Sequence, residues 1–257
     1  IRIMGIFLFS LFLIFLLLDC LEEKKISRRK IHYFLTLLIS FPIIVYIFWP
    51  FLWDDPVNKF LFTIKSFANY NWPGEVFYLG KFYKGSDLPW HYIPVWIIIT
   101  TPILMIFFII GGFFKIGKCF FTNFINLSEK NKLWVDINQK KDFFILFFFI
   151  LPIFLVIVLN STLYSGWRHL YFIYPSLIYF LAISLMVINK INLLQKKKII
   201  TVSLIVILVI INILNLIKYH PYQNVFFNVL AEKKANEKFE IDYWGLGNKE
   251  ALKFCKK

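Results

Sequence analysis

Long apolar runs separated by short charged breaks recur along the whole chain. Since a helix that crosses a bilayer needs roughly 20 mostly apolar residues, these runs predict membrane-spanning helices. Prolines interrupt or flank several runs, which membrane helices tolerate because neighbouring helices and water satisfy the freed backbone groups. We expect six such helices, at 3–19, 31–51, 92–114, 142–159, 167–188 and 197–217.

The composition agrees with this pattern. Hydrophobic residues make up 59% of the chain and aromatic residues 21%, whereas soluble domains average about 45–50% apolar residues. The sequence therefore predicts an all-α, polytopic membrane protein. The chain starts at Ile1 inside a run that is already apolar, so we interpret it as a fragment that begins near or within a helix.

Basic residues are unevenly distributed between the expected helices. The net charge of +14 would suggest nucleic acid in a soluble protein, but in a membrane protein it first reports topology. Lysine and arginine fill the first, third and fifth connections, whereas the second and fourth carry few, partly offset by carboxylates. The positive-inside rule therefore places the second and fourth connections outside the cytoplasm, and we expect no nucleic-acid partner.

Tryptophan, tyrosine, histidine and carboxylates gather on this predicted outer side, at 49–56, 69–94, 160–169 and 218–252. An aromatic belt at the membrane interface explains many of these residues individually. A belt, however, forms on both surfaces, and the predicted inner side is poor in tryptophan and tyrosine. The one-sided distribution favours a site that faces outward.

Two outward segments are long enough to have structure of their own. The loop 52–91 alternates turn residues with short apolar stretches, so we expect a structured lid or a re-entrant element, with 60–70 as a helix lying in the membrane interface. The tail 218–257 is too polar to cross the membrane. We expect it to form a small outward cap, with an extended piece near 238–244 and a short helix after Gly247.

The candidate site centres on "YSGWRHLYFIYPSL", residues 164–177, where charged residues open an apolar run. Arginine binds phosphate through bidentate, charge-assisted hydrogen bonds, so Arg168 is the leading candidate. The alternative is an arginine that snorkels to the lipid headgroups. The candidate phosphate-binding residues are Arg168, His169, His91, Trp167 and Lys81, with Lys84 as an alternative lysine.

Carboxylates on the same side are candidates for supporting these cations or for proton transfer. They are Glu75, Asp87 and Asp242. Asp54 and Asp55 directly precede Pro56, and we interpret them as residues that cap a turn. Three irregularly spaced cysteines predict neither a disulfide framework nor a metal cluster, so no metal ligands are assigned.

Three stretches resemble one family: "DLPWHYIPVWIIITTPILMIFFIIG", "YSGWRHLYFIYPSL" and "HPYQNVFFNVLAEKKANEKFEIDYWGLGNKEAL". They are similar to bacterial membrane glycosyltransferases of the GT-C superfamily, related to protein O-mannosyltransferases and to the aminoarabinose transferase of lipid A. The resemblance covers most of residues 49–252. It implies an enzyme of the bacterial cytoplasmic membrane whose site faces the periplasm or exterior.

The resemblance further implies that sugar moves from a polyprenyl-phosphate carrier to a protein, lipid or glycan acceptor, with no cofactor. The catalytic carboxylate of such enzymes lies in an earlier outward loop, so we expect it upstream of this chain, and the catalytic residue stays unknown. Arg168 would stabilise the leaving phosphate. Two alternatives remain: a transporter or flippase of lipid-linked sugar, and a non-catalytic, truncated membrane protein.

Overall fold

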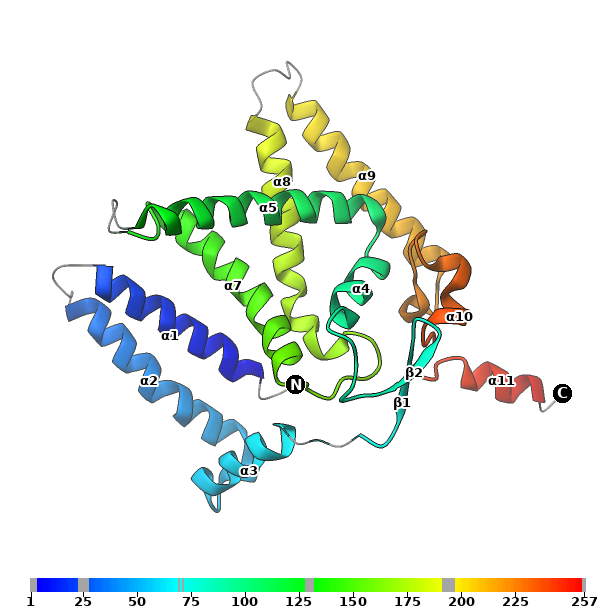
Figure 1. Cartoon of the computed structure of the whole chain (residues 1–257), viewed down its shortest axis with the longest axis horizontal. Helices are drawn as coiled ribbons and strands as arrows, with labels where there is room; N and C mark the ends of the chain where they lie inside the picture. Colours follow the sequence, from blue (N-terminus) through cyan, green and yellow to red (C-terminus); the bar gives the residue numbers. More distant parts are fainter. Residues whose placement is uncertain are drawn as a thin grey trace. The chain divides into compact units, whose positions relative to one another are not determined.

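The structure, a computed structural model, describes residues 4–22, 28–68, 70, 72–127, 132–190 and 197–255 (Figure 1). The protein is mostly helical, at 72%. It divides into two compact units, one of Ile1–Asn71 with Cys119–Pro152 and the other of Trp72–Lys118 with Ile153–Lys257.

Within the described residues, five helices are long and apolar enough to cross a membrane. These segments are Arg28–Phe48 (α2), Ile103–Ile125 (α5), Ile137–Val158 (α7), Arg168–Lys190 (η2 and α8) and Ile199–Lys218 (in α9). Protein buries none of the apolar stretch of α2 and only 6% of that of α9. Because apolar surface of this extent requires lipid around it, the expectation of a helical, polytopic membrane protein is confirmed.

Several helix boundaries differ from those expected. The run 3–19 becomes α1 (Met4–Glu22), whose apolar part, Phe7–Asp19, is shorter than the five spans. Residue 3 itself lies outside the described residues. The helices expected at 31–51, 142–159 and 197–217 are α2, α7 and α9 (Lys197–Lys218), with ends shifted by a few residues.

A single helix at 92–114 was the wrong expectation. The chain forms α4 (Tyr92–Ile99), breaks at Thr100–Pro102, and continues as α5. Pro102 has no N–H to donate to the Ile98 carbonyl, so one helical hydrogen bond is missing at this break. The side-chain amide of Asn228 donates instead to the Ile98 and Thr101 carbonyls, both at 2.7 Å, and its backbone N–H donates to Ile99 at 2.8 Å.

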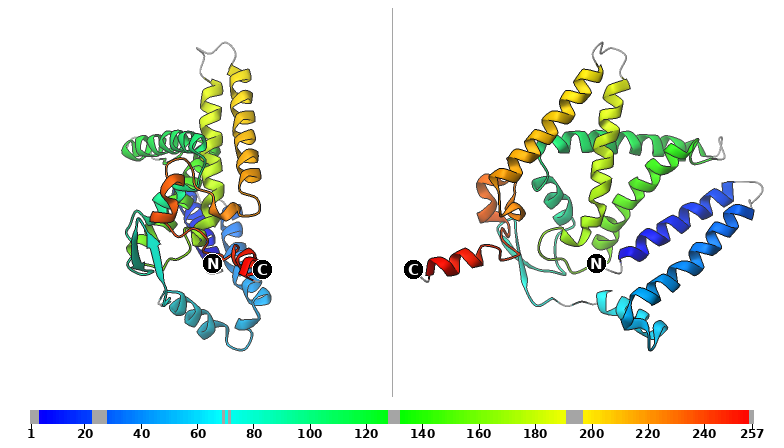
Figure 2. Two further views of the ribbon diagram at one scale, coloured as in Figure 1. Left: turned by 90° about the vertical axis from the view of Figure 1, so that its right-hand side faces the viewer. Right: turned by 180° about the vertical axis from the view of Figure 1, so that it is seen from behind.

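The helix expected at 167–188 also begins differently. Residues Arg168–Ile173 form a 3-10 helix, η2, and the α-helix α8 spans Tyr174–Lys190. The views in Figure 2 show α8 and α9 side by side, and they pack against each other. Arg168 and His169 therefore lie on the tighter turns that precede α8.

Helices α5 and α8 approach very closely. A Cβ at Gly112 would collide with the Phe180 carbonyl oxygen, and the Ser184 hydroxyl donates to the Phe108 carbonyl at 2.6 Å. Small residues allow such backbone contact between membrane helices, where packing and hydrogen bonds replace the hydrophobic effect. This contact fixes α8 against α5 in the second unit.

The loop 52–91 contains a β-hairpin. Strand β1 (Glu75–Tyr78) pairs antiparallel with β2 (Lys81–Lys84), and Leu79 and Gly80 form the turn with φ of 51° and 79°. Positive φ at both turn residues is typical of the tight hairpin turn that matches strand twist. Gly80 also donates its N–H to the Lys238 carbonyl, and Glu240 donates to Phe77, so the tail adds to the hairpin edge.

The C-terminal tail is anchored on an aromatic core. Trp96 of α4 is buried and contacts the rings of Phe227, Phe239 and Tyr243 at 5.8–6.4 Å. The tail contains η3 (Gln223–Val225), η4 (Glu232–Lys234), α10 (Ala235–Lys238) and α11 (Asn248–Cys255). Its aromatic residues therefore hold α4, the hairpin and the tail as one packed cap within the second unit.

The first unit contains α1, α2, the 3-10 turn η1 (Pro50–Leu52) and α3 (Pro56–Ala68). Asp19 forms an ion pair with Lys140 of α7 and lies 4.0 Å from Lys30. Phe15 stacks on Trp134 at 5.7 Å, and Lys140 lies over the same ring. A partly buried carboxylate paired with two lysines avoids the cost of an isolated charge at a helix end.

Candidate functional site

The turn 160–167 brings the candidate residues into place. Asn160, Ser165 and Gly166 adopt positive φ, which turns the chain sharply between α7 and η2. Leu163 donates its N–H to the Gly85 carbonyl at 3.0 Å. A Cβ at Gly85 would lie 2.8 Å from the Leu163 carbonyl, so the loop after β2 packs tightly on this turn.

Arg168 is held between two aromatic rings. Its guanidinium carbon lies 4.7 Å from the centre of the Tyr164 ring and 4.8 Å from that of Trp244 in the tail. Tyr164 in turn stacks on Trp72 at 4.7 Å. Such stacking orients the planar guanidinium without using its hydrogen-bond donors. In the described part of the chain, the buried Arg168 Nε has no hydrogen-bond partner.

Glu240 is a site carboxylate that sequence reasoning missed. Burial raises its pKa, and the positive charge of Arg168 partly opposes that rise. Its Oε2 is buried without a hydrogen-bond partner among the described residues. Its position follows from the pairing of residues 238–240 with the hairpin. This pairing joins segments far apart in the chain, so no local sequence motif predicts it.

Trp167 lines a cavity of about 390 Å³ in the second unit. Ligand cavities typically measure about 300–1,000 Å³. Its lining contains aromatic, hydroxyl and amide side chains: Thr100, Trp167, Tyr171, Tyr174, Gln223, Asn224, Phe226 and Tyr243. None of these lining residues is charged.

Hydrogen bonds order the cavity wall. The Trp167 indole donates to the Thr100 hydroxyl at 3.0 Å, and that hydroxyl donates to the Trp96 carbonyl at 2.6 Å. The Asn224 amide donates to Asp242 at 3.2 Å, while the buried Oδ1 of Asn224 has no partner in the described chain. An unpaired acceptor beside an open cavity is suited to a ligand hydroxyl.

Adjacent residues connect the cavity with the arginine. Trp167 lines the cavity and Arg168 follows it, while Tyr243 lines the cavity and Trp244 covers Arg168. Two neighbouring pairs from distant parts of the chain thus place an uncharged aromatic cavity next to an aromatic-clamped cation. The sequence predicted Arg168 and Trp167, but not the tail residues opposite them.

The remaining predicted histidines have aromatic partners. The His169 ring lies edge-on to Tyr164 at 4.6 Å, so it joins the Arg168 cluster. His91 Nδ1 instead lies 2.7 Å from the hydroxyl of buried Tyr78. Burial raises the pKa of Tyr78, with a further contribution from Tyr83, so this phenol stays protonated beside His91.

The predicted lysine and two of the predicted carboxylates lie exposed in or near the β-hairpin. Lys81 is exposed opposite Tyr78 in the hairpin, and exposed Glu75 lies opposite Lys84. Asp87 accepts a hydrogen bond from Ser86 at 2.9 Å.

Asp242 accepts hydrogen bonds from the Leu246 and Gly247 N–H groups at 3.1 and 2.8 Å. The Gly247 bond is the main cause of its lowered pKa. Asp242 thus orders the turn before α11, and only its bond to Asn224 reaches the cavity wall.

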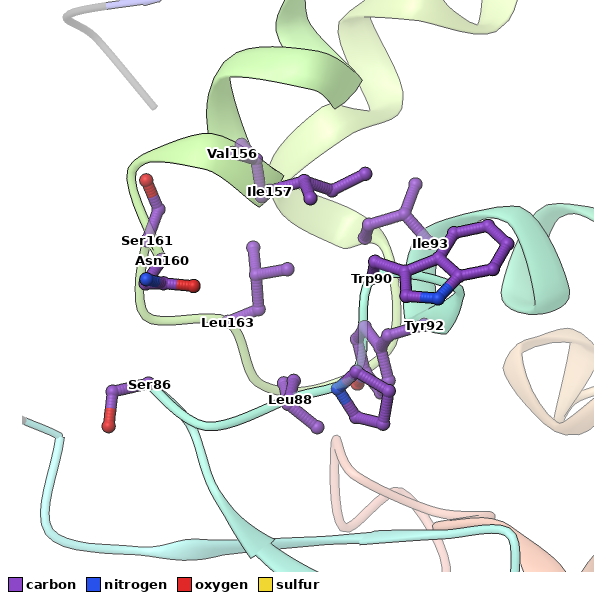
Figure 3. Close-up of a pocket in the computed structure, with 11 residues that line it drawn as sticks. Ser86, Leu88, Trp90, Tyr92, Ile93, Val156, Ile157, Asn160, Ser161 and Leu163 are labelled. Atoms are coloured by element: carbon purple, nitrogen blue, oxygen red, sulfur yellow. The ribbon is translucent and has the colours of Figure 1, made fainter.

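A second cavity lies beside the same turn. Figure 3 shows it between residues 86–93 and the end of α7, with Asn160 and Ser161 on one side and Trp90 on the other. Its volume is about 90 Å³, and its lining is largely apolar. This volume is well below the range typical of ligand sites, so the larger cavity is the better candidate.

Comparison of the chain with protein-family models, with curated proteins and with solved structures found no match. The assignment of roles in the site therefore depends on its own geometry and chemistry.

Proposed function

We propose that this protein is a membrane glycosyltransferase that takes its sugar from a polyprenyl-phosphate carrier. The observation that carries the proposal is the pairing of Trp167–Arg168 with Tyr243–Trp244, which sets an uncharged cavity beside a clamped cation. A sugar attached to a phosphate combines the same two features, an uncharged hydroxyl-rich ring and an adjacent anion. The GT-C resemblance of these stretches supports the same class of substrate.

The cavity chemistry fits a sugar ring. The aromatic side chains of the cavity wall can pack against the apolar C–H faces of a sugar ring. Aromatic side chains line most small-molecule sites in the same way. Thr100, Gln223 and Asn224 offer hydroxyl and amide groups for ring hydroxyls. The absence of charge in the described lining favours a neutral sugar in the cavity and leaves the phosphate to Arg168.

The reaction requires little covalent participation by these residues. The acceptor oxygen attacks the anomeric carbon and gives up its proton to a general base. The bond from that carbon to the phosphate oxygen breaks, and polyprenyl phosphate leaves with the bonding electrons. Arg168 stabilises the charge that develops on the phosphate, which is the role of a preorganised cation next to a leaving group. In this proposal the site faces the exterior of the cell.

The test is a transfer assay in proteoliposomes. The protein, expressed from its complete reading frame, is reconstituted with polyprenyl phosphate carrying a radiolabelled sugar and with an extract of cell-envelope acceptors. We expect label in the acceptor fraction, and strong loss of transfer in Tyr243→Ala with normal transfer in the exposed control Asn236→Ala. Movement of labelled lipid across the bilayer without any transfer product would instead indicate a transporter.

A further inference from the structure

Helix α3 follows α2 after a short rigid connection. The Trp53 indole donates to the Tyr46 carbonyl at 2.9 Å, and the Tyr46 hydroxyl donates to the Trp53 carbonyl at 3.2 Å. Figures 1 and 2 show that α3 leaves the end of α2 in a new direction. The reciprocal bonds fix this change of direction at the end of a membrane-spanning helix.

The start of α3 is stabilised locally. Asp55 accepts a hydrogen bond from the Asn58 N–H at 3.2 Å, and Pro56 is the first helical residue. This combination is the preferred start of a helix and confirms the capping role expected for Asp55. Asp54 pairs with Lys59 at 2.7 Å, which lowers the pKa of this exposed carboxyl. Asp55 thus caps the start of α3, and Asp54 forms an ion pair with Lys59 in its first turn.

One face of α3 is apolar and uncovered by protein. Val57, Leu61 and Ile64 recur at intervals of four and three residues, and they are 66%, 49% and 39% exposed. This spacing places them in one stripe. Asn58 and Lys65 lie to one side of this stripe and are also exposed, as is Phe62 between them at 63%. The helix is therefore amphipathic, and its apolar face has no cover within the described first unit.

We infer that the lipid bilayer covers this face, with α3 lying in the membrane interface. The helix has 13 residues, a length of about 20 Å, which is too short to cross a hydrocarbon core of about 30 Å. Its attachment through η1 places α3 at the end of α2, and protein buries none of the apolar stretch of α2. The bilayer that surrounds α2 is thus continuous with the face left open on α3.

Apolar burial, rather than charge, drives this contact. Residues 54–65 contain two carboxylates, Asp54 and Asp55, and two lysines, Lys59 and Lys65, so their net charge is zero. Interfacial helices that depend on anionic lipid carry an excess of lysine or arginine. The inference is independent of the proposed enzymatic function, because it uses only the first unit.

The experiment places nitroxide labels on α3 in the whole protein. Cys20, Cys119 and Cys255 are replaced by alanine, single cysteines are introduced at 58, 61, 64 and 65, and each protein is reconstituted in phosphatidylcholine vesicles. Collisions with oxygen, which concentrates in the bilayer, are compared with collisions with a water-soluble nickel chelate. Labels at 61 and 64 should favour oxygen by at least about threefold relative to the matched controls at 58 and 65.

Equal exposure of all four labels to the nickel chelate would overturn the inference. So would shielding of 61 and 64 that disappears when the protein is diluted at constant lipid, because a second copy of the chain would then be the cover. Neither high salt nor anionic lipid should change the oxygen preference more than about twofold. A larger change would contradict contact driven by the apolar stripe.

Discussion

The guanidinium carbon of Arg168 lies 4.8 Å from the centre of the Trp244 ring, although the two residues are far apart in the chain. The tail thus supplies one side of the clamp and the turn before η2 supplies the other. Trp96 holds the tail in this position through its contacts with Phe227, Phe239 and Tyr243. The guanidinium of Arg168 is thereby stacked against rings from two separate segments of the chain.

This clamp predicts a graded response to substitution. Trp244→Ala should lower transfer by up to about tenfold, because a cation–π contact contributes about 0.5–2 kcal/mol to positioning the cation. Trp244→Phe should retain most activity. Arg168→Ala should abolish transfer, and Arg168→Lys should restore only part, since lysine lacks the planar fork. Initial rates of transfer in proteoliposomes measure the effect of each substitution. Full activity of Arg168→Ala would refute the phosphate-binding role.

Removing the side chain of Asn228 should destabilise the second unit. The amide is buried and satisfies the Ile98 and Thr101 carbonyls at the break between α4 and α5. Leaving buried carbonyls unpaired costs about 1–3 kcal/mol. We expect Asn228→Ala to lower the midpoint of thermal unfolding in detergent, followed by loss of monodisperse elution. The exposed Asn236→Ala is the matched control and should unfold like the parent protein.

The close contact of α5 and α8 predicts different effects for two glycines of one helix. Gly112→Ala would force a Cβ into the Phe180 backbone and should cost about 1–3 kcal/mol, as overpacking does. Gly117→Ala meets nothing within 4 Å, so it should be neutral or stabilising by up to about 1 kcal/mol through helix propensity. Thermal unfolding of both variants tests the contact. Equal effects would show that it does not form in the membrane.

The raised pKa of Glu240 predicts that the stability of the protein depends on pH. Burial raises its pKa in the folded protein above the ordinary value of 4.5. Between these two pKa values the folded state holds more protons than the unfolded state, so stability falls as pH rises through that window. Glu240→Gln should flatten this part of the stability curve, whereas Glu237→Gln at an exposed site should not. An unchanged slope in Glu240→Gln would assign the effect to another group.

Topology provides a prediction that concerns the whole site. If the loop 52–91 faces the exterior, a single cysteine at Lys84 should react with a membrane-impermeant maleimide in intact cells. A cysteine at Lys132 should react only after the membrane is opened, because its connection is expected in the cytoplasm. Both lysines are exposed. The reverse pattern would place the Arg168 site on the cytoplasmic side and contradict the proposed function.

Local pattern was sufficient for the membrane class, for most of the spans and for the prominence of Arg168. Apolar run length is a local property, and a charged residue within such a run is costly enough to be conspicuous. Proline alone did not reveal the break at Pro102, because membrane helices often tolerate it. The deciding partner, Asn228, lies more than 100 residues away in the chain.

The sequence by itself determined that this chain is a membrane protein, because the free energy of moving apolar side chains from water into lipid depends on composition and on the length of the apolar runs. Only the tertiary structure decided which residues share the site. Trp244, Tyr243 and Glu240 come from a polar tail that aromatic packing brings onto α4 and the hairpin. Such contacts depend on distances between segments remote in sequence. The structure also shows that His91 forms a hydrogen bond with Tyr78 and that Asp242 accepts a hydrogen bond from Gly247 in the turn before α11.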